Sequence, residues 1–232
     1  MVYPMQALEY NPLTVPSYQL IDAARYLHVP YPTLHSWTAS RGRSKAVIKL
    51  ALADPPTLSF MDLIECWVLA SLRNREGISM GKVRSAVETL RLKYNSRHPL
   101  AEKEFQTDGV DLFVKESVVL VNVSKAAQFV FRDIVEAHLR RIERDDAGLA
   151  RRLFPFTRAR QLKSKVDVPK LIMIDPLISF GRPVLRGTAV CTSVLASRFR
   201  GGDSIESLAR EYGRKQSEIK EAIYWERTAA AA

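Results

Sequence analysis

Hydrophobic residues recur at helical spacing in two short segments near opposite ends of the chain. Between Tyr18 and Trp37, and again between Ser204 and Trp225, the pattern predicts two short helices joined by a tight turn. The matched positions are Ala24, Arg25, Leu27, Leu34 and Trp37 in the first copy and Ala209, Arg210, Tyr212, Ile219 and Ala222 in the second. The small residue lets two helices cross closely. Such pairs are typical of helix-turn-helix units that bind nucleic acid, and also of ordinary helix hairpins.

Prolines set the bounds of the elements around the first copy. A helix is expected over about 20–27, and Pro32 is well placed in the first turn of the next helix, where no amide donor is needed. The extended run 46–52 follows a basic stretch and stops before Pro55 and Pro56. This arrangement predicts a basic hairpin, or wing.

Two longer helices are expected after the hairpin. Ser59 and Asp62 have the spacing of a capping box, and an apolar stripe runs from there to Leu72. A second helix opens at Ser79 and keeps the helical period to about Asn95. Four helices and a wing therefore predict one compact module.

The middle of the chain is expected to combine strands with one long helix. Residues 110–115 and 117–123 are predicted to be two short strands, and 127–139 a long amphipathic helix. The basic stretch 154–165 lacks periodicity and is interpreted as a linker. This small element is a candidate for dimerisation.

The last segment is expected to open with a strand over 171–174 and to continue in helices. The glycine pair 201–202 ends a helix over 193–199. Asp203 is expected to cap the next helix, with Glu206 in the place of the reciprocal capping acid.

The pattern as a whole predicts a mainly α protein of three parts. Residues 1–100 form a winged helix-turn-helix part, 101–165 hold the strand pair, long helix and basic linker, and 166–232 form a helix-turn-helix part with a short β element. With 232 residues, 47% of them hydrophobic, the chain is large enough to bury substantial cores.

The formal net charge of +10 is concentrated in one stretch. Residues 140–170 carry 10 basic and 4 acidic side chains, so more than half of the excess lies there. Such a stripe attracts phosphate backbones and releases their counterions. The competing interpretation is a solvated helix end followed by a linker. Charge alone therefore does not decide between the two.

Residues able to perform catalysis or hold metal show no recognisable arrangement. The four histidines lack ligand spacing, and neither Cys66 nor Cys191 has a cysteine or histidine nearby in sequence. Nucleophile-elbow, P-loop and dinucleotide motifs are missing from the sequence. We therefore expect no enzyme activity, no cofactor and no zinc site. The two cysteines are expected to be buried thiols, and the lack of a membrane-length apolar run or a secretion signal favours a cytoplasmic address.

The first part resembles the winged helix-turn-helix of the MerR superfamily. Besides the basic wing, the resemblance rests on Tyr18, Leu20, Ala23, Ala24, Leu27, Val29, Pro30, Thr33, Leu34, Trp37, Phe60, Asp62 and Leu63. In that superfamily the second helix enters the major groove and the wing grips the DNA backbone. The resemblance implies base-facing and phosphate-facing residues, respectively Tyr31, Thr33, His35 and Ser36, and Arg41, Arg43 and Lys45. Because none of the four base-facing residues is Arg, Asn or Gln, we expect modest sequence specificity or readout of DNA shape.

Residues 168–227 resemble a small family, long catalogued as a domain of unknown function, that includes antitoxins of VapBC-type modules. The match rests on Ile174-Asp175-Pro176, Phe180-Gly181-Arg182-Pro183-Val184, Gly187-Thr188-Ala189-Val190, Gly202-Asp203-Ser204-Ile205, Leu208-Ala209, Tyr212 and Ile219. The whole chain is thus similar to a VapB-type antitoxin with an added MerR-like part. This resemblance implies two partners. One is a PIN-type ribonuclease toxin encoded nearby, which the protein silences, and the other is the operator DNA of its own operon.

Four arginines are candidates for contact with such a toxin: Arg182, Arg186, Arg198 and Arg200. A PIN nuclease holds divalent metal with clustered carboxylates, so an inserted guanidinium would neutralise or displace the ion. The competing interpretation is that Arg182 only pairs with a local acid such as Asp175.

Three functional hypotheses follow from these features. The first is a homodimeric antitoxin and autorepressor, because paired half-sites along DNA multiply weak contacts. The second is a MerR-like transcription regulator that responds to a small ligand, with 101–165 as the sensor. The third is an adaptor that joins proteins without binding DNA.

Overall fold

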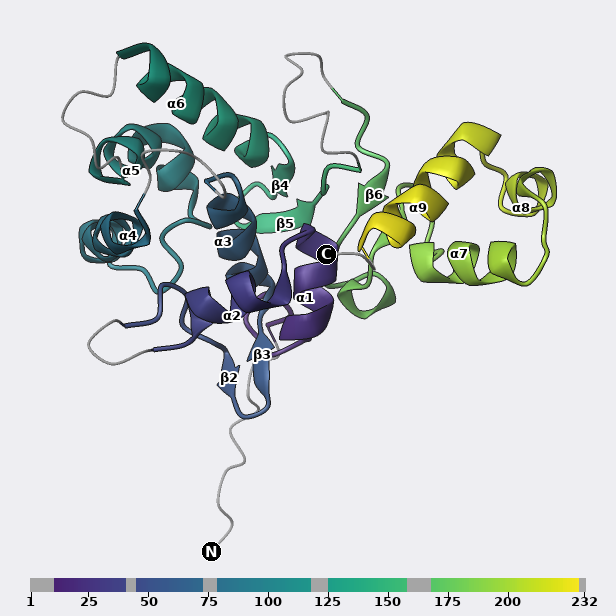
Figure 1. Cartoon of the computed structure of the whole chain (residues 1–232), viewed down its shortest axis with the longest axis horizontal. Coiled ribbons are helices and arrows are strands. Elements are labelled where there is room, and N and C mark those ends of the chain that lie inside the picture. The colour runs from purple at the N-terminus through teal and green to yellow at the C-terminus, as the bar shows by residue number, and fades with distance from the viewer. Residues whose placement is uncertain (1–10, 41–44, 73–78, 118–124, 158–167, 230–232) are drawn as a thin grey trace, which may run out of the picture.

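The computed structural model describes residues 11–40, 45–72, 79–117, 125–157 and 168–229 (Figure 1). Helices dominate these residues, and the few strands form small sheets and hairpins. The prediction of a mainly α protein is confirmed. Figure 1 shows α4, α5 and α6 on one side, α1 to α3 in the centre, and α7, α8 and α9 on the other side.

The two short helices of the first copy form as expected. Helix α1 (Leu20–Leu27) has the predicted bounds, and α2 (Tyr31–Thr38) follows it after a short turn. His28 adopts a left-handed conformation with φ 52° and ends α1, while Pro30 precedes α2. Leu34 and Trp37 are buried and seat α2 against the core.

A three-stranded antiparallel sheet lies beside these helices. Its strands are β1 (Tyr18–Gln19), β2 (Leu52–Ala53) and β3 (Pro56–Leu58), in the order β1-β3-β2. A hairpin is therefore present, but its strand pairing begins at Leu52 rather than at residue 46. Pro56 is tolerated because it is the first residue of its strand.

Along the segment 45–50, arginine side chains bind the main-chain carbonyls that a neighbouring strand would bind in a sheet. They belong to α4 and to the loop after it, and each donates to a main-chain carbonyl: Arg84 to Lys45, Arg91 to Val47 and Arg97 to Leu50. In addition, the amides of Val47 and Ile48 both donate to the carbonyl of Trp37. These bonds satisfy the backbone without a ladder, so the prediction of a strand over 46–52 is wrong for most of its length.

Helix α3 (Phe60–Ala70) confirms the predicted capping box, whereas the side chain of Ser79 makes no capping hydrogen bond to α4 (Met80–Tyr94). The Ser59 hydroxyl accepts from the Asp62 amide while the Asp62 carboxylate accepts from the Ser59 amide, which completes the capping box. Helix α4 begins after Ser79 and ends at Asn95, which adopts a left-handed conformation with φ 47°.

The prediction of a strand over 110–115 is wrong. A π-helical turn over Phe105–Gly109 leads into α5 (Val110–Ser117), and α6 (Lys125–Leu139) follows. The buried residues of α5 are Val110, Phe113, Val114 and Ser117, a spacing that places them on one helical face. Packing on α4 and α6 thus overrides the strand preference of the valines. Most of the second predicted strand, 117–123, lies outside the described residues.

Two antiparallel hairpins connect the middle of the chain to its C-terminal part. Strands β4 (Ile142–Arg144) and β5 (Ala150–Leu153) form the first, and β6 (Ile172–Met173) and β7 (Val184–Leu185) form the second. Leu153 and Ile174 exchange both backbone hydrogen bonds, which joins the two hairpins. The first hairpin was not predicted, whereas β6 lies within the strand expected over 171–174.

Three helices close the chain: α7 (Thr192–Arg200), α8 (Ile205–Glu211) and α9 (Gln216–Ala229). The cap of α8 is Ser204, whose hydroxyl accepts from the Ser207 amide. The prediction of an Asp203 cap is therefore wrong by one residue. Asp203 instead accepts a hydrogen bond from Arg198 at 2.6 Å.

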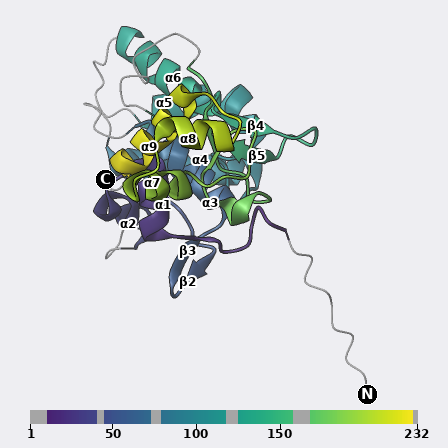
Figure 2. The same cartoon turned by 90° about the vertical axis from the view of Figure 1, so that its right-hand side faces the viewer.

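The described residues form a large N-terminal core, a smaller C-terminal core and a third small cluster of Phe154, Met173 and Val184. Ile174 belongs to the first and Ile172 to the second. The C-terminal core includes Trp225 of α9, and Tyr26 of α1 packs against it. Both views of the molecule place α9 beside α1 (Figure 2).

Candidate functional site

Helix α2 divides into a buried face and an accessible face. Leu34 is fully buried and Trp37 nearly so, whereas Tyr31 is 40% exposed. His35 is half-buried, and its ring centroid lies 5.9 Å from that of Tyr31. Ser36 is also half-buried and donates to the carbonyl of Thr33 at 2.7 Å. The four predicted base-facing residues therefore lie on one helix and retain access to solvent.

The predicted wing is only partly described. Lys45 is exposed, while Arg41 and Arg43 lie outside the described residues. Arginines of α4 and of the following loop bond the carbonyls of the segment 45–50. The segment that leads out of the basic run is therefore fixed to α4 by charge-assisted hydrogen bonds.

Arg141, counted in the basic stripe, is a buried clamp. Only 4% of its surface is exposed, and its guanidinium donates to four carbonyls, those of Phe154, Pro155, Val168 and Pro169. The guanidinium carbon also lies 5.0 Å from the centroid of the Phe156 ring. Arg141 thus joins the chain on either side of residues 158–167.

Other basic residues of the stripe also serve internal contacts. Arg144 donates to the carbonyls of Ala101 and Glu102, and burial lowers its pKa. Arg152 binds Asp175 at 2.9 Å, and Lys170 binds Glu143 at 3.2 Å. The interpretation of residues 140–170 as one free phosphate-binding stripe is therefore wrong for four residues: Arg141, Arg144, Arg152 and Lys170. Arg158, Arg160, Lys163 and Lys165 lie outside the described residues.

The turn between β6 and β7 exposes an aromatic residue next to an arginine. Phe180 is 85% exposed, and both Ser179 and Phe180 adopt left-handed backbone conformations, with φ 49° and 57°. Two successive non-glycine residues in this region store strain, which often accompanies a functional site. Arg182 is exposed and makes no ion pair with another described residue. Because Asp175 binds Arg152, the interpretation that Arg182 pairs with Asp175 is wrong.

The other predicted toxin-binding arginines differ in availability. Arg186 is exposed and lies over the Phe154 ring at 5.4 Å, beside a hollow of about 570 Å³ that both residues help to line. Arg200 is exposed near the end of α7. Arg198, in contrast, donates to Asp203 and Glu211, and these bonds raise its pKa. Arg198 therefore holds α7 to α8 and is the least available of the four.

Aromatic residues join the first helix pair to the last helix. The Trp225 ring lies 5.4 Å from the His28 ring and 6.3 Å from the Tyr26 ring, and Arg25 binds Glu226 at 3.4 Å. Burial lowers the pKa of His28 to about 4, while burial and the charge of Asp22 raise the pKa of Tyr26 to about 12. Helix α9 corresponds in the second copy to α2 in the first. Its side with Trp225 and Glu226 is thus packed against α1 and the turn that follows α1.

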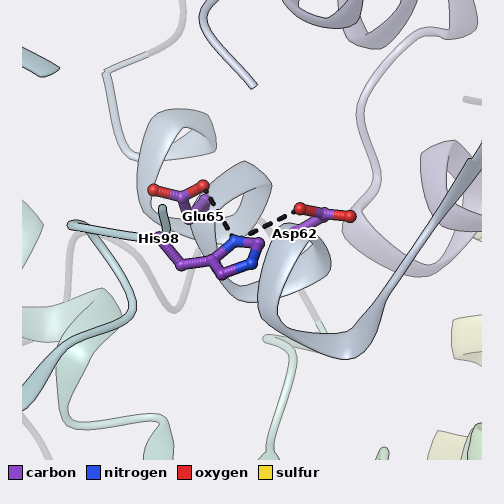
Figure 3. A group of neighbouring side chains, drawn as sticks. All are labelled: Asp62, Glu65 and His98. Carbon is purple, nitrogen blue, oxygen red and sulfur yellow. Dashed lines mark ion pairs between the residues drawn. The ribbon is translucent and has the colours of Figure 1, made fainter. Parts of the chain in front are cut away.

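A buried group of two carboxylates and one imidazole lies inside the N-terminal part. Nδ1 of His98 lies 3.3 Å from Oδ1 of Asp62 and 3.5 Å from Oε2 of Glu65 (Figure 3). Burial raises the pKa of Glu65. Burial by itself would lower the pKa of His98, but the two carboxylates outweigh it and raise that pKa to about 9. This group is the candidate metal-ligand set among the described residues.

Sequence spacing does not reveal this group, because His98 is more than thirty positions from the two acids. One signal was available. Asp62 and Glu65 are spaced i, i+3 within an otherwise apolar helix. This spacing places both acids on the same helical face and predicts that they are buried side by side. The capping box explains Asp62 but leaves Glu65 without a role. Tertiary contact between α3 and the loop after α4 supplies the third member.

Comparison with known proteins matches the C-terminal part to a family model and nearly the whole chain to individual relatives. Residues 172–225 match the family described as "Protein of unknown function (DUF433)". The chain is 28% identical over 237 residues to "Putative antitoxin VapB45" of Mycobacterium tuberculosis, which covers 90% of the chain and 93% of that relative. It is 23% identical over 219 residues to "Uncharacterized protein Rv2308" of the same organism, with 89% and 88% covered.

A solved structure shares the fold across the chain. The crystal structure of Rv2018 from Mycobacterium tuberculosis superposes with a TM-score of 0.67 at 25% identity, and the match covers 90% of this chain and 98% of that one. Among the described residues, no helix is both long and apolar enough to cross a membrane. The chain therefore shares its architecture over nearly its full length with Rv2018, and its residues 172–225 match the DUF433 model.

Proposed function

We propose that this protein is a non-enzymatic antitoxin that binds and neutralises a PIN-type ribonuclease and, as a cytoplasmic homodimer, represses its own operon. The observation that carries the proposal is the similarity over 90% of the chain to a relative described as an antitoxin. The N-terminal helix pair and wing would bind operator DNA, and the C-terminal part would bind the toxin.

The turn that carries Phe180 and Arg182 is the best candidate for the toxin contact. An exposed aromatic residue beside an exposed arginine has the composition of a binding hot spot. A metal-binding nuclease site presents clustered carboxylates, and a guanidinium matches these by bidentate hydrogen bonds. Arg186 and Arg200 are exposed and are the further candidates for this contact. Arg198 instead holds α7 to α8 through Asp203 and Glu211.

Co-expression with the product of the adjacent gene tests the antitoxin role. We expect growth rescue and co-purification with the intact chain, and loss of both when Phe180→Ala and Arg182→Ala are combined. Arg140→Ala is the matched control, since this exposed arginine lies just after α6 and outside the proposed contact. An adjacent gene product that is not a nuclease, or that is not restrained, would refute the antitoxin proposal.

DNA binding is proposed to use α2 and the wing. Tyr31, Thr33, His35 and Ser36 would face the bases, and Arg41, Arg43 and Lys45 the phosphates. The three wing residues changed together to alanine should weaken promoter binding in a gel-shift assay and flatten its salt dependence, with no loss of folding by circular dichroism. A matched triple change of Lys115, Arg132 and Lys220, which are exposed and lie outside both the wing and the stretch 140–170, should leave the affinity unchanged. Equal affinity of the wing variant and the parent chain would remove the wing from the proposal.

The same experiments separate the competing functions. A MerR-like regulator would bind promoter DNA and show a thermal shift with a small ligand but none with a nuclease. An adaptor would bind no promoter DNA. The antitoxin proposal requires both the nuclease partner and salt-sensitive DNA binding.

A further inference from the structure

The carboxylates of Asp62 and Glu65 each have one oxygen committed to the backbone and one turned toward His98. Oδ2 of Asp62 accepts from the amides of Ser59 and Ala51, and Oε1 of Glu65 accepts from the amide of Leu100. These bonds fix both carboxylate planes. The remaining oxygens and Nδ1 of His98 are buried without a hydrogen-bond partner among the described residues.

The distances suit a metal ion better than they suit hydrogen bonds. The two contacts of His98 Nδ1 are 3.3 and 3.5 Å long, and neither has hydrogen-bond geometry. Tetrahedral zinc binds nitrogen and oxygen at about 2.0–2.2 Å, which places neighbouring ligand atoms roughly 3.3–3.6 Å apart. All three donor atoms lie within 4.8 Å of one another. The two distances from His98 Nδ1 therefore match the spacing of neighbouring ligands around zinc, and the third donor pair lies within 4.8 Å.

Charge balance favours the same occupant. The side chains of Asp62, Glu65 and His98 are 0%, 1% and 12% exposed. Two carboxylates buried side by side are costly in a dry site unless a cation lies between them. Arg91 also acts on Glu65, but its guanidinium is bonded to Glu88 and to the carbonyl of Val47. A divalent cation with a neutral imidazole would bring the group to zero net charge.

We propose that Asp62, Glu65 and His98 form a zinc-binding site that ties α3 to the loop after α4. One imidazole nitrogen with two carboxylate oxygens is a donor set that suits Zn²⁺, whereas Mg²⁺ and Ca²⁺ favour oxygen ligands. Asp62 opens α3 and bonds Ala51 next to the hairpin, so the bound ion would stabilise the part of the chain proposed to bind DNA.

Zinc binding by the full-length, metal-stripped protein tests the proposal. We expect one Zn²⁺ per chain by calorimetry and elemental analysis, a rise in melting temperature with Zn²⁺ and no such rise with Mg²⁺. Glu65→Gln and His98→Gln should each weaken zinc binding at least about tenfold. His35→Gln, which changes a half-buried histidine on α2, is the matched control and should bind zinc like the parent chain.

X-ray absorption of the zinc-loaded parent chain provides a readout that does not depend on the folding of any variant. Nitrogen and oxygen ligands around the ion are the expected result. Sulfur in the first shell would assign the ion to Cys66 or Cys191 and overturn the proposal. Failure of the parent chain to retain zinc, or unchanged affinity in folded Glu65→Gln and His98→Gln variants, would also overturn it.

Discussion

Protonation of His28 should loosen the contact between the N-terminal helix pair and α9. The imidazole lies against the Trp225 ring at 5.4 Å, and burial lowers its pKa from 6.5 to about 4. The backbone of Trp225 provides a hydrogen bond that favours the protonated form, but burial outweighs it. The folded protein therefore resists a charge that the unfolded chain accepts freely.

The sign and size of the effect follow from the two pKa values. Between the folded and unfolded pKa, the unfolded chain binds more protons, so stability rises with pH in that window. The contribution of His28 is fully present above an unfolded pKa of about 6.5 and is lost as pH falls toward about 4. Lowering the pH from about 8 to about 5 should reduce the free energy of unfolding by about 2 kcal/mol through this group.

Urea unfolding of the parent chain and of His28→Asn at both pH values measures this contribution. Asparagine does not titrate and tolerates the left-handed conformation that His28 adopts with φ 52°. All other titrating groups are common to both proteins, so the difference between their pH dependences isolates His28. Parallel loss of stability in the two proteins would refute the assignment of a depressed pKa to this contact.

Four further substitutions test other features of the fold. Gly181→Ala should cost about 2–4 kcal/mol by thermal unfolding, because φ is +72° and the new Cβ would clash with the Tyr18 hydroxyl. Gly213→Ala, with φ +60° and no atom within 4 Å of the new Cβ, should cost only about 1 kcal/mol, and equal losses would exclude the clash. Arg141→Met should cost about 3–5 kcal/mol in urea unfolding because buried carbonyls lose their donor, and a loss below about 1 kcal/mol would contradict the clamp. Ser204→Ala should cost about 1 kcal/mol, whereas unchanged stability would contradict its role as the cap of α8.

Local signals in the sequence predicted the elements whose hydrogen bonds are formed by residues close together in the chain. The first helix has the expected bounds, and the capping box at Ser59 forms as its spacing requires, because a cap depends only on residues three positions apart. The prediction at Asp203 failed by one position, since Ser204 is an equally good capping residue and Asp203 is occupied by Arg198. Local chemistry could not rank these two neighbours.

Long-range contacts decided where charge and aromatic side chains were placed. The run 140–170 is basic in composition, but Arg141 and Arg152 are bound to carbonyls and to Asp175, which lie far from them in sequence. Composition reports how many charges a segment carries and cannot report which of them are already paired. The exposure of Phe180 was missed for the same reason, since an aromatic residue is usually buried when only its own segment is considered.

The sequence by itself determined that the chain is mainly helical, where most helices begin, and which apolar residues seat the two helix pairs, because these depend on periodicity and on contacts within a few residues. Only the tertiary structure decided that 110–117 is a helix, that α9 is packed against α1, and that His98 meets Asp62 and Glu65. The physical reason is common to all three. Burial against a distant element outweighs local backbone preference, which spans less than about 1 kcal/mol per residue, and no spacing in the sequence records which distant element that will be.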